Sequence, residues 1–289
     1  MLMFKLKNIV DQNKNALPIY LRSLLKEYLQ LNVLYFIYTN DLYNNALVFT
    51  GGTCLRHFYQ LPRLSEDLDF DVVKAIDSSQ LLSYVVDSFN KHFMYSDLTV
   101  SLKQKGRQIL FKFPVLYDLG LASASESNYL YIKLDLEFKP ITKYAQTKVS
   151  LKSYQNLAFV AKHYDLPTLF AKKTGALLLR NVLKGKENRV SFKGRDYFDL
   201  IWLLQNQTPI NLAHLRIILQ DPQLTIAKLK QMLTNKINQT TQYTYFSSDL
   251  IADLLPFISD SSMVKTFAQS FKQLFEQNIN NLTESQPIT

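Results

Sequence analysis

Apolar residues in the first half of the chain recur with two different spacings. Some stretches place an apolar side chain at every third or fourth position, as a helix with one buried face requires. Shorter stretches are apolar throughout, or alternate apolar and polar residues, which is typical of strands. These patterns predict helices at 18–38, 53–59 and 78–93, and strands at 46–49, 67–73, 98–105, 107–117 and 128–138. Helices interleaved with strands indicate a mixed β-sheet of four or five strands over roughly residues 40–160.

Two of these predicted strands carry charged residues at alternate positions. The earlier one contains Asp67, Asp69 and Asp71, and the later one contains Lys133, Asp135 and Glu137. Successive side chains of a strand point to opposite faces, so each strand has one charged face and one apolar face.

The second half of the chain has a helical pattern almost throughout. It predicts a helix over 167–182, a basic loop, a helix that starts near Arg195, and three or four further helices over 210–280. The fold class is therefore α/β (α+β), with a mixed-sheet lobe flanked by helices at 1–160 and a helical lobe at 161–289. Glycine is scarce and no low-complexity linker occurs, so we expect two closely apposed lobes.

The composition is that of a globular protein with an excess of positive charge. The 289 residues are 47% hydrophobic and include 33 Lys and Arg against 24 Asp and Glu, a net charge of +9. This excess favours a polyanionic partner such as nucleic acid, although a basic but ordinary surface is the alternative. Cys54 is the only cysteine, which excludes an internal disulfide. No apolar run is long enough to span a membrane, so we expect a soluble, cytoplasmic protein.

The three alternating aspartates suggest a cation site. Like charges on one face of a strand repel, and a cation between them relieves this repulsion. Oxygen ligands select a hard metal such as Mg²⁺, or Mn²⁺. Asp67 and Asp69 are the expected ligands, and Asp135 is the best third carboxylate, with Glu137 as second choice. The alternative is a solvated acidic strand.

A glycine pair precedes these carboxylates. Gly51, Gly52 and Thr53 follow an apolar strand and open a helix, where backbone N–H groups can be approached closely by a phosphate. Arg56 lies one helical turn later and Arg63 lies in the next loop, and each is a candidate phosphate ligand or a surface charge. The glycines and carboxylates together indicate a site for a nucleoside triphosphate.

The predicted helix 167–182 has cations on an otherwise apolar face. Lys173 and Arg180 share that face, and Asp196 opens the next helix, where its charge favours the helix dipole. Buried cations are costly unless they meet an anion or line a cleft. The alternative is an ion pair of Asp196 with Lys173 or Arg180 that fastens two helices. The loop between the helices carries Lys184, Lys186, Arg189, Lys193 and Arg195.

These motifs together resemble the AbiEii/AbiGii toxin family of the DNA polymerase β-like nucleotidyltransferase superfamily, which includes MenT-like toxins. The resemblance rests on four colinear segments within residues 48–200: Gly51-Gly52-Thr53-Cys54-Leu55-Arg56, the stretch from Leu61 to Phe70, Ala171-Lys172-Lys173 through Arg180, and Gly194-Arg195-Asp196-Tyr197-Phe198-Asp199-Leu200.

The resemblance implies a Mg²⁺-dependent nucleotidyltransferase that uses NTP and is the toxin of an abortive-infection system. Its acceptor would be RNA, at the 3′ end of the tRNA acceptor stem, so that translation is blocked. A winged-helix antitoxin encoded nearby would be its partner. The alternatives are nucleotidylation or phosphorylation of a protein such as the antitoxin, or a module that binds RNA or a partner without catalysis.

The resemblance also implies roles for individual residues, with the helical lobe completing the active-site cleft. Asp67 and Asp69 would bind metal, and Gly51, Gly52 and Thr53 would bind the nucleotide. Lys173 would contact phosphate, and Asp196 would be an active-site residue. Arg56 and Arg180 fall on nucleotide-binding positions. Lys172 stands where the family often has an acidic residue, and helical phase favours Lys173 as the residue in the cleft.

Overall fold

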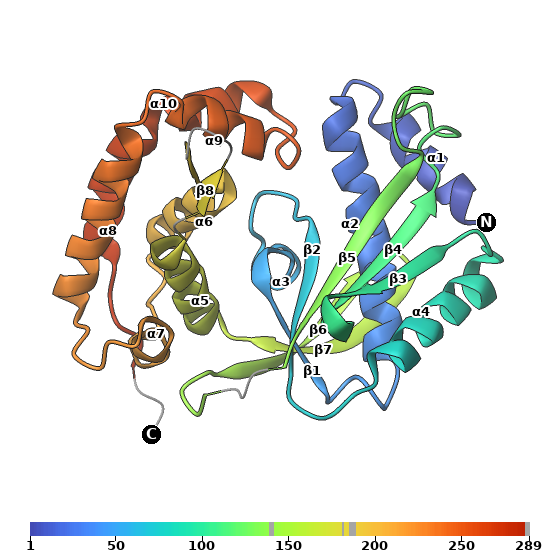
Figure 1. Cartoon of the computed structure of the whole chain (residues 1–289), viewed down its shortest axis with the longest axis horizontal. Coiled ribbons are helices and arrows are strands. Elements are labelled where there is room, and N and C mark those ends of the chain that lie inside the picture. Colours follow the sequence, from blue (N-terminus) through green and yellow to red (C-terminus); the bar gives the residue numbers. More distant parts are fainter. Residues whose placement is uncertain (139–141, 181, 185–188, 287–289) are drawn as a thin grey trace. The chain divides into compact units, whose positions relative to one another are not determined.

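The computed structural model describes residues 1–138, 142–180, 182–184 and 189–286, and only the backbone of 182–184 and 189–191. The chain divides into two compact units (Figure 1). The first, here called the sheet unit, comprises residues 1–141 and 147–164. The second, the helical unit, comprises residues 142–146 and 165–289.

Seven strands within the described residues form one mixed sheet in the sheet unit, in the order β3-β4-β5-β2-β1-β7-β6. The strands are β1 (Leu47–Thr50), β2 (Asp67–Val72), β3 (Thr99–Lys103), β4 (Gln108–Pro114), β5 (Tyr129–Glu137), β6 (Thr147–Tyr154) and β7 (Leu157–Tyr164). Strand β2 runs parallel to β5, and β1 runs parallel to β7. The remaining pairs are antiparallel, including β3 with β4, whose strands the sequence predicted.

The prediction of four or five strands was wrong because it omitted the β6–β7 hairpin. Strand β6 alternates apolar and polar residues, but its apolar residues lie on the exposed face. Val149 and Leu151 of β6 and Val160 of β7 are exposed apolar residues, while the opposite face of β6 carries Lys148 and Lys152. The apolar residues therefore do not mark the buried face of this hairpin.

Three helices of the sheet unit cover the apolar face of the sheet, opposite its charged face. They are α2 (Pro18–Tyr38), α3 (Gly51–Tyr59) and α4 (Ser78–Phe93), with α1 (Leu2–Gln12) packed on α2 and not predicted. Aromatic rings join these helices to the sheet: Tyr38 stacks on Phe159, Phe58 stacks on His163, and Phe89 meets Phe113 edge to face. Because these strand residues share the face of Leu68 and Phe70, the alternating aspartates of β2 lie on the other face.

The helical unit contains α5 (Leu166–Leu179), α6 (Gly194–Gln205), α7 (Leu212–Leu219), α8 (Ile226–Thr241), α9 (Phe246–Leu254) and α10 (Ser261–Asn278), with a short hairpin of β8 (Val182–Lys184) and β9 (Arg189–Ser191). Tyr197 of α6 contacts the rings of Phe192, Phe246 and Phe271, which form an aromatic core. Helix α5 ends before the predicted 182 because Arg180 is already extended. Of the predicted basic loop, Lys186 lies outside the described residues, as do the side chains of Lys184 and Arg189.

Among the described residues, none of the helices combines the length and the apolar character that a membrane-spanning helix needs.

Candidate active site

The glycine pair and the carboxylate strand form one site in the sheet unit. Gly51 joins β1 to α3 with a φ of +79°, a left-handed conformation that glycine adopts without strain. A Cβ atom on Gly51 would lie 2.0 Å from Oδ2 of Asp69. The absence of a side chain therefore lets the Asp69 carboxylate lie directly against the backbone of the turn.

Arg63 lies beneath the second glycine. A Cβ atom on Gly52 would be 3.1 Å from Nη2 of Arg63 and 2.8 Å from the Ser65 hydroxyl oxygen. Arg63 is only 3% exposed and donates a hydrogen bond of 2.8 Å to the carbonyl of Leu64. Arg63 thus places a buried guanidinium directly against the turn.

Arg56, the arginine favoured by the sequence, pairs instead with a carboxylate of α2. Its Nε lies 2.7 Å from Oε1 of Glu27, and its guanidinium also donates to the carbonyl of Leu61. Thr53 is held by a hydrogen bond from its hydroxyl to the backbone carbonyl of Asp67. The structure thus brings Gly51, Gly52 and Thr53 to the carboxylate strand, whereas Arg56 is fastened to α2.

The register of β2 and β5 places the predicted carboxylates side by side. Asp69 stands opposite Asp135, and Asp67 stands opposite Lys133. Neighbouring residues in paired strands share a face, so the charged faces of both strands coincide, as the sequence predicted. Asp71 stands opposite Glu137 and accepts a hydrogen bond of 2.7 Å from the hydroxyl of Tyr164.

Lys133 bridges two of these carboxylates. Its Nζ lies 2.9 Å from Oδ2 of Asp67 and 3.0 Å from Oδ2 of Asp135, and Gln108 donates to the other oxygen of Asp135 at 2.8 Å. Burial raises the pKa of Asp67, and Lys133 opposes this rise. Burial alone would lower the pKa of Lys133, but its hydrogen bonds and ion pairs with both carboxylates raise it overall. The two carboxylates therefore converge on a single cation.

The donor set fits a hard divalent metal. Within the described ranges, no group of three or more His, Cys, Asp or Glu residues is already gathered as a metal cluster. Asp67 and Asp135 nevertheless aim one oxygen each at the same ammonium group, and Asp69 is the β-sheet partner of Asp135. Carboxylate oxygens around one centre of positive charge are the ligands that Mg²⁺ takes in proteins.

The helical unit gathers the second group of predicted residues. Nζ of Lys173, on α5, lies 2.7 Å from Oδ2 of Asp199 and 3.7 Å from Oδ1 of Asp196. Nη1 of Arg180 lies 2.5 Å from Oδ2 of Asp196. The ion pairs of Asp196 that the sequence offered as an alternative are therefore present, and they join α5 to α6. Asp196 lies in the first turn of α6, where the helix dipole favours its charge.

Sequence reasoning missed Lys133, Asp199 and the position of Arg63. The sequence pattern could have indicated Lys133 and Asp199, since each lies on the same face of its strand or helix as a predicted site residue. It could not have indicated Arg63, because the burial of Arg63 depends on the fold of the loop around it.

A glycine turn against paired carboxylates on a mixed sheet is the arrangement expected of a nucleotidyltransferase. The chain belongs to the AbiEii family, the nucleotidyl transferase AbiEii toxins of type IV toxin–antitoxin systems, whose model matches residues 34–277. It is thus a toxin-family nucleotidyltransferase.

Solved structures resemble the fold at low sequence identity. MenT4, a nucleotidyltransferase toxin from Mycobacterium tuberculosis, is 12% identical with a TM-score of 0.51, over 95% of this chain and 97% of that one. JHP933 from Helicobacter pylori is 18% identical with a TM-score of 0.44, over 88% and 94% of the two chains. No curated protein sequence matches the chain significantly.

Proposed function

We propose that this protein transfers a nucleoside monophosphate from an NTP to an RNA acceptor, with Mg²⁺, and acts as the toxin of its toxin–antitoxin pair. The observation that carries the proposal is the contact of Gly51 with Asp69, beside Asp135 on the adjacent strand. The proposed phosphate site thus lies beside the carboxylates, as transfer of a nucleotidyl group requires.

The glycine turn is the proposed site of the triphosphate. The open backbone at Gly51 and Gly52, at the start of α3, allows the close approach of phosphate oxygens, and Arg63 adds a buried positive charge. Mg²⁺ held by Asp67, Asp69 and Asp135 would neutralise phosphate charge and lower the pKa of the attacking hydroxyl. Lys133 must then give up its ion pairs to that cation.

The helical unit supplies the remaining proposed residues. Lys173 is proposed to contact phosphate, and Asp196 is proposed as an active-site residue whose carboxylate Lys173 and Arg180 orient. The ion pairs of Asp196 with Lys173 and Arg180 are compatible with these roles, because a carboxylate held by two cations is fixed in position.

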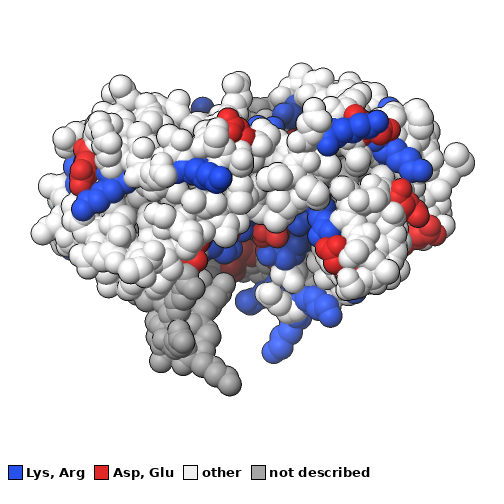
Figure 2. Space-filling model, turned by 90° about the horizontal axis from the view of Figure 1, so that it is seen from above, with Lys and Arg blue, Asp and Glu red and all other residues white. Residues whose placement is uncertain are grey.

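An RNA acceptor is favoured by charge. The net charge of the chain is +9, and basic side chains occupy more of the face drawn in Figure 2 than acidic ones do. A polyanion is attracted to such a surface over long distances. We take the unpaired 3′ end of tRNA as the acceptor, whose modification would block translation, and an antitoxin encoded nearby as the partner.

The decisive test incubates purified protein with one labelled NTP at a time, Mg²⁺ and total tRNA. We expect label in RNA, and loss of the label on addition of EDTA or with Asp67→Ala. Label on a protein band in place of RNA would identify a protein acceptor, and no transferred label at all would contradict the proposal.

A further inference from the structure

Two tyrosines continue the charged face of β5 beyond the candidate active site. Alternate residues of a strand share a face, so Tyr129 and Tyr131 lie on the same face as Lys133 and Asp135. Each tyrosine is 38% exposed, although β5 is an inner strand that lies between β4 and β2 (Figure 1). At a rise of about 3.4 Å per residue, Tyr131 lies about 7 Å and Tyr129 about 14 Å from Lys133 along the strand. An aromatic surface therefore begins within two strand positions of the lysine that bridges the proposed metal ligands.

The rings of these two tyrosines do not stack on each other. Their centroids are 6.1 Å apart and their planes are tilted by 47°. The residues that pair with them on β4 are Lys112 and Pro114, so β4 places no aromatic ring against either of them. Part of each flat ring is thus accessible to a planar ligand.

The β3–β4 hairpin beside the tyrosines carries positive charge alone. Residues 98–117 include no Asp or Glu, and their four basic residues are Lys103, Lys105, Arg107 and Lys112. None of these four side chains forms a salt bridge with an acidic residue that the structure describes. Their charge is therefore not compensated within the hairpin, and it attracts a polyanion.

Two of these lysines share the face of the tyrosines. Lys112 is the β-sheet partner of Tyr131, and Lys103 pairs with Gln108, which is itself the partner of Asp135. Residues that pair across strands share a face of the sheet. Lys103, Lys112, Tyr129 and Tyr131 thus form one surface, here called the tyrosine–lysine surface.

The order of the strands separates this surface from the proposed NTP site. Gly51 follows β1, the tyrosines lie on β5, and β2 with Asp69 lies between β1 and β5. The carboxylates therefore lie between the glycine turn and the tyrosine–lysine surface. A nucleotidyl transfer needs this order, because the attacking and leaving oxygens lie on opposite sides of the transferred phosphorus.

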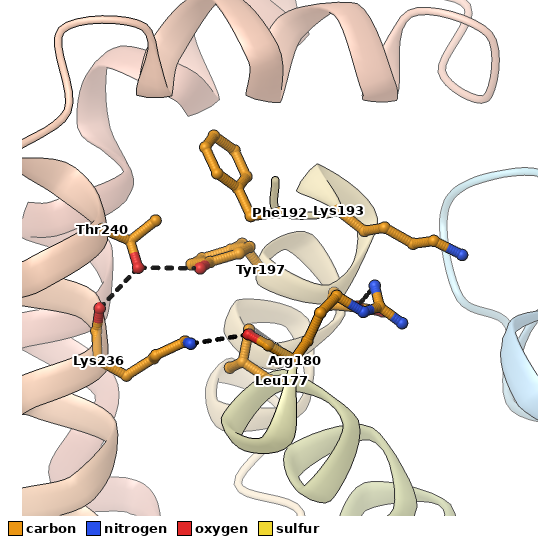
Figure 3. A pocket seen from close by; sticks show the side chains of 8 residues that line it. Leu177, Arg180, Phe192, Lys193, Tyr197, Lys236 and Thr240 are labelled. Atoms are coloured by element: carbon orange, nitrogen blue, oxygen red, sulfur yellow. Dashed lines mark hydrogen bonds and ion pairs between the residues drawn. The ribbon is translucent and has the colours of Figure 1, made fainter. Parts of the chain in front are cut away.

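The helical unit also has a basic pocket, but its polar groups bond to one another (Figure 3). Lys236 donates a hydrogen bond of 3.0 Å to the carbonyl of Arg180, whose guanidinium lies 2.5 Å from Oδ2 of Asp196. The hydroxyl of Tyr197 donates to Oγ1 of Thr240 at 3.1 Å. The remaining space admits about one water molecule, which is too little for a base or a phosphate.

We propose that the tyrosine–lysine surface binds the unpaired end of the acceptor RNA, with a base stacked on Tyr131 and backbone phosphates beside Lys112 and Lys103. The inference rests on the proposed function, which it deepens by locating the acceptor subsite on the sheet unit. Any base can stack on an aromatic ring and every linkage carries a phosphate, so neighbouring tyrosines and lysines suit unpaired RNA. Duplex RNA does not fit, because its bases already stack on one another.

The first test replaces the ring of Tyr131. Tyr131→Leu keeps an apolar side chain but removes the flat surface, so the KM for RNA should rise about tenfold while the KM for NTP stays within about twofold. Tyr131→Phe keeps the ring and should restore the wild-type KM for RNA. The matched control is Tyr144→Leu, because Tyr144 is 39% exposed and belongs to the helical unit. An unchanged KM for RNA, an equal rise for NTP, or an equal rise in the control would overturn the proposal.

The second test measures the contribution of the phosphate contacts. Fluorescence anisotropy with a labelled single-stranded oligoribonucleotide, without NTP or metal, gives the slope of log Kd against log salt concentration. This slope should fall by about 0.7 in Lys112→Gln, since one phosphate contact is lost. Lys148→Gln is the control, because exposed Lys148 pairs with His163 and so lies on the opposite face of the sheet. The same slope in both variants would overturn the assignment of Lys112.

The binding measurement also separates this inference from the proposed function. Tyr131→Leu should bind the single-stranded probe about tenfold more weakly than wild type, and a duplex of the same sequence should not distinguish the two proteins. If wild type transfers no nucleotide but these differences are seen, only the transfer proposal fails. If wild type labels RNA while Tyr131→Leu binds the probe as wild type does, only the surface assignment fails.

Discussion

The two units hold their charged residues by different means. In the sheet unit, Asp67, Asp69 and Asp135 are placed by backbone pairing of β2 with β5 and by contact with Gly51. In the helical unit, Lys173, Arg180 and Asp196 are placed by ion pairs between the side chains of α5 and α6. Backbone pairing survives the loss of one side chain, whereas a network of buried ion pairs depends on each member. Substitutions should therefore affect the two units differently.

The largest loss of stability is expected from Lys173→Met. It would leave Asp199, which is 0% exposed and 2.7 Å from Lys173, as a buried carboxylate without this cation. We expect a loss of about 3–5 kcal/mol in the free energy of unfolding, measured by urea titration. The same change at Lys228, whose half-exposed side chain pairs with Asp221, should cost less than about 1 kcal/mol. Equal losses in both variants would contradict the contrast between buried and exposed pairs.

Gly51→Ala should slow transfer about 100-fold while affecting stability less. The new methyl group would lie 2.0 Å from Asp69 Oδ2, and φ is +79°, so both the turn and the carboxylate must shift. A shift of about 1 Å at a reacting centre lowers kcat roughly 100-fold. Gly120→Ala is the control, since Gly120 also has a positive φ, but a Cβ atom there would meet no described atom within 4 Å. It should lose about 1 kcal/mol of stability and retain its activity.

Acid should weaken the sheet unit through His57. Burial lowers the pKa of His57 to about 3, with Lys152 and Arg56 adding to the effect, against 6.5 for a free histidine. At a pH between these two pKa values, His57 therefore binds a proton in the unfolded chain but not in the folded chain. The contribution of His57 to the free energy of unfolding is complete above about pH 6.5. It falls as the pH falls, by about 2 kcal/mol at pH 5. Urea unfolding at pH 7 and pH 5 should show this difference in wild type, and His57→Leu should reduce it by that amount.

Lys133→Met should give the smallest change in stability but a gain in metal binding. Lys133 occupies the centre shared by Asp67 and Asp135 and is about one-third exposed, so its loss should cost about 1 kcal/mol. Without this competing cation, calorimetric titration should show Mg²⁺ bound several-fold more tightly. Lys112→Met is the control, because Lys112 lies on β4 on the same sheet face as Lys133. It should leave the affinity for Mg²⁺ unchanged. Weaker Mg²⁺ binding in Lys133→Met would mean that the lysine supports the metal site.

Much of the fold and of the candidate site followed from local pattern. Alternation in β2 and β5 predicted which residues share the charged face, and the spacing in α5 predicted that Lys173 and Arg180 lie together. A strand has a period of two and a helix of 3.6, so short segments determine their own faces. The β6–β7 hairpin was missed because its exposed face is apolar.

Only the tertiary structure decided which partner each charged residue takes. The sequence favoured Arg56 near the phosphate site, but the fold pairs Arg56 with Glu27 and buries Arg63 under Gly52 instead. Lys133 and Asp199 likewise acquire their roles from neighbouring elements. The sequence by itself determined the faces, the glycine turn and the aspartate pattern. Contacts between distant elements depend on strand register and helix packing, and no local periodicity encodes either.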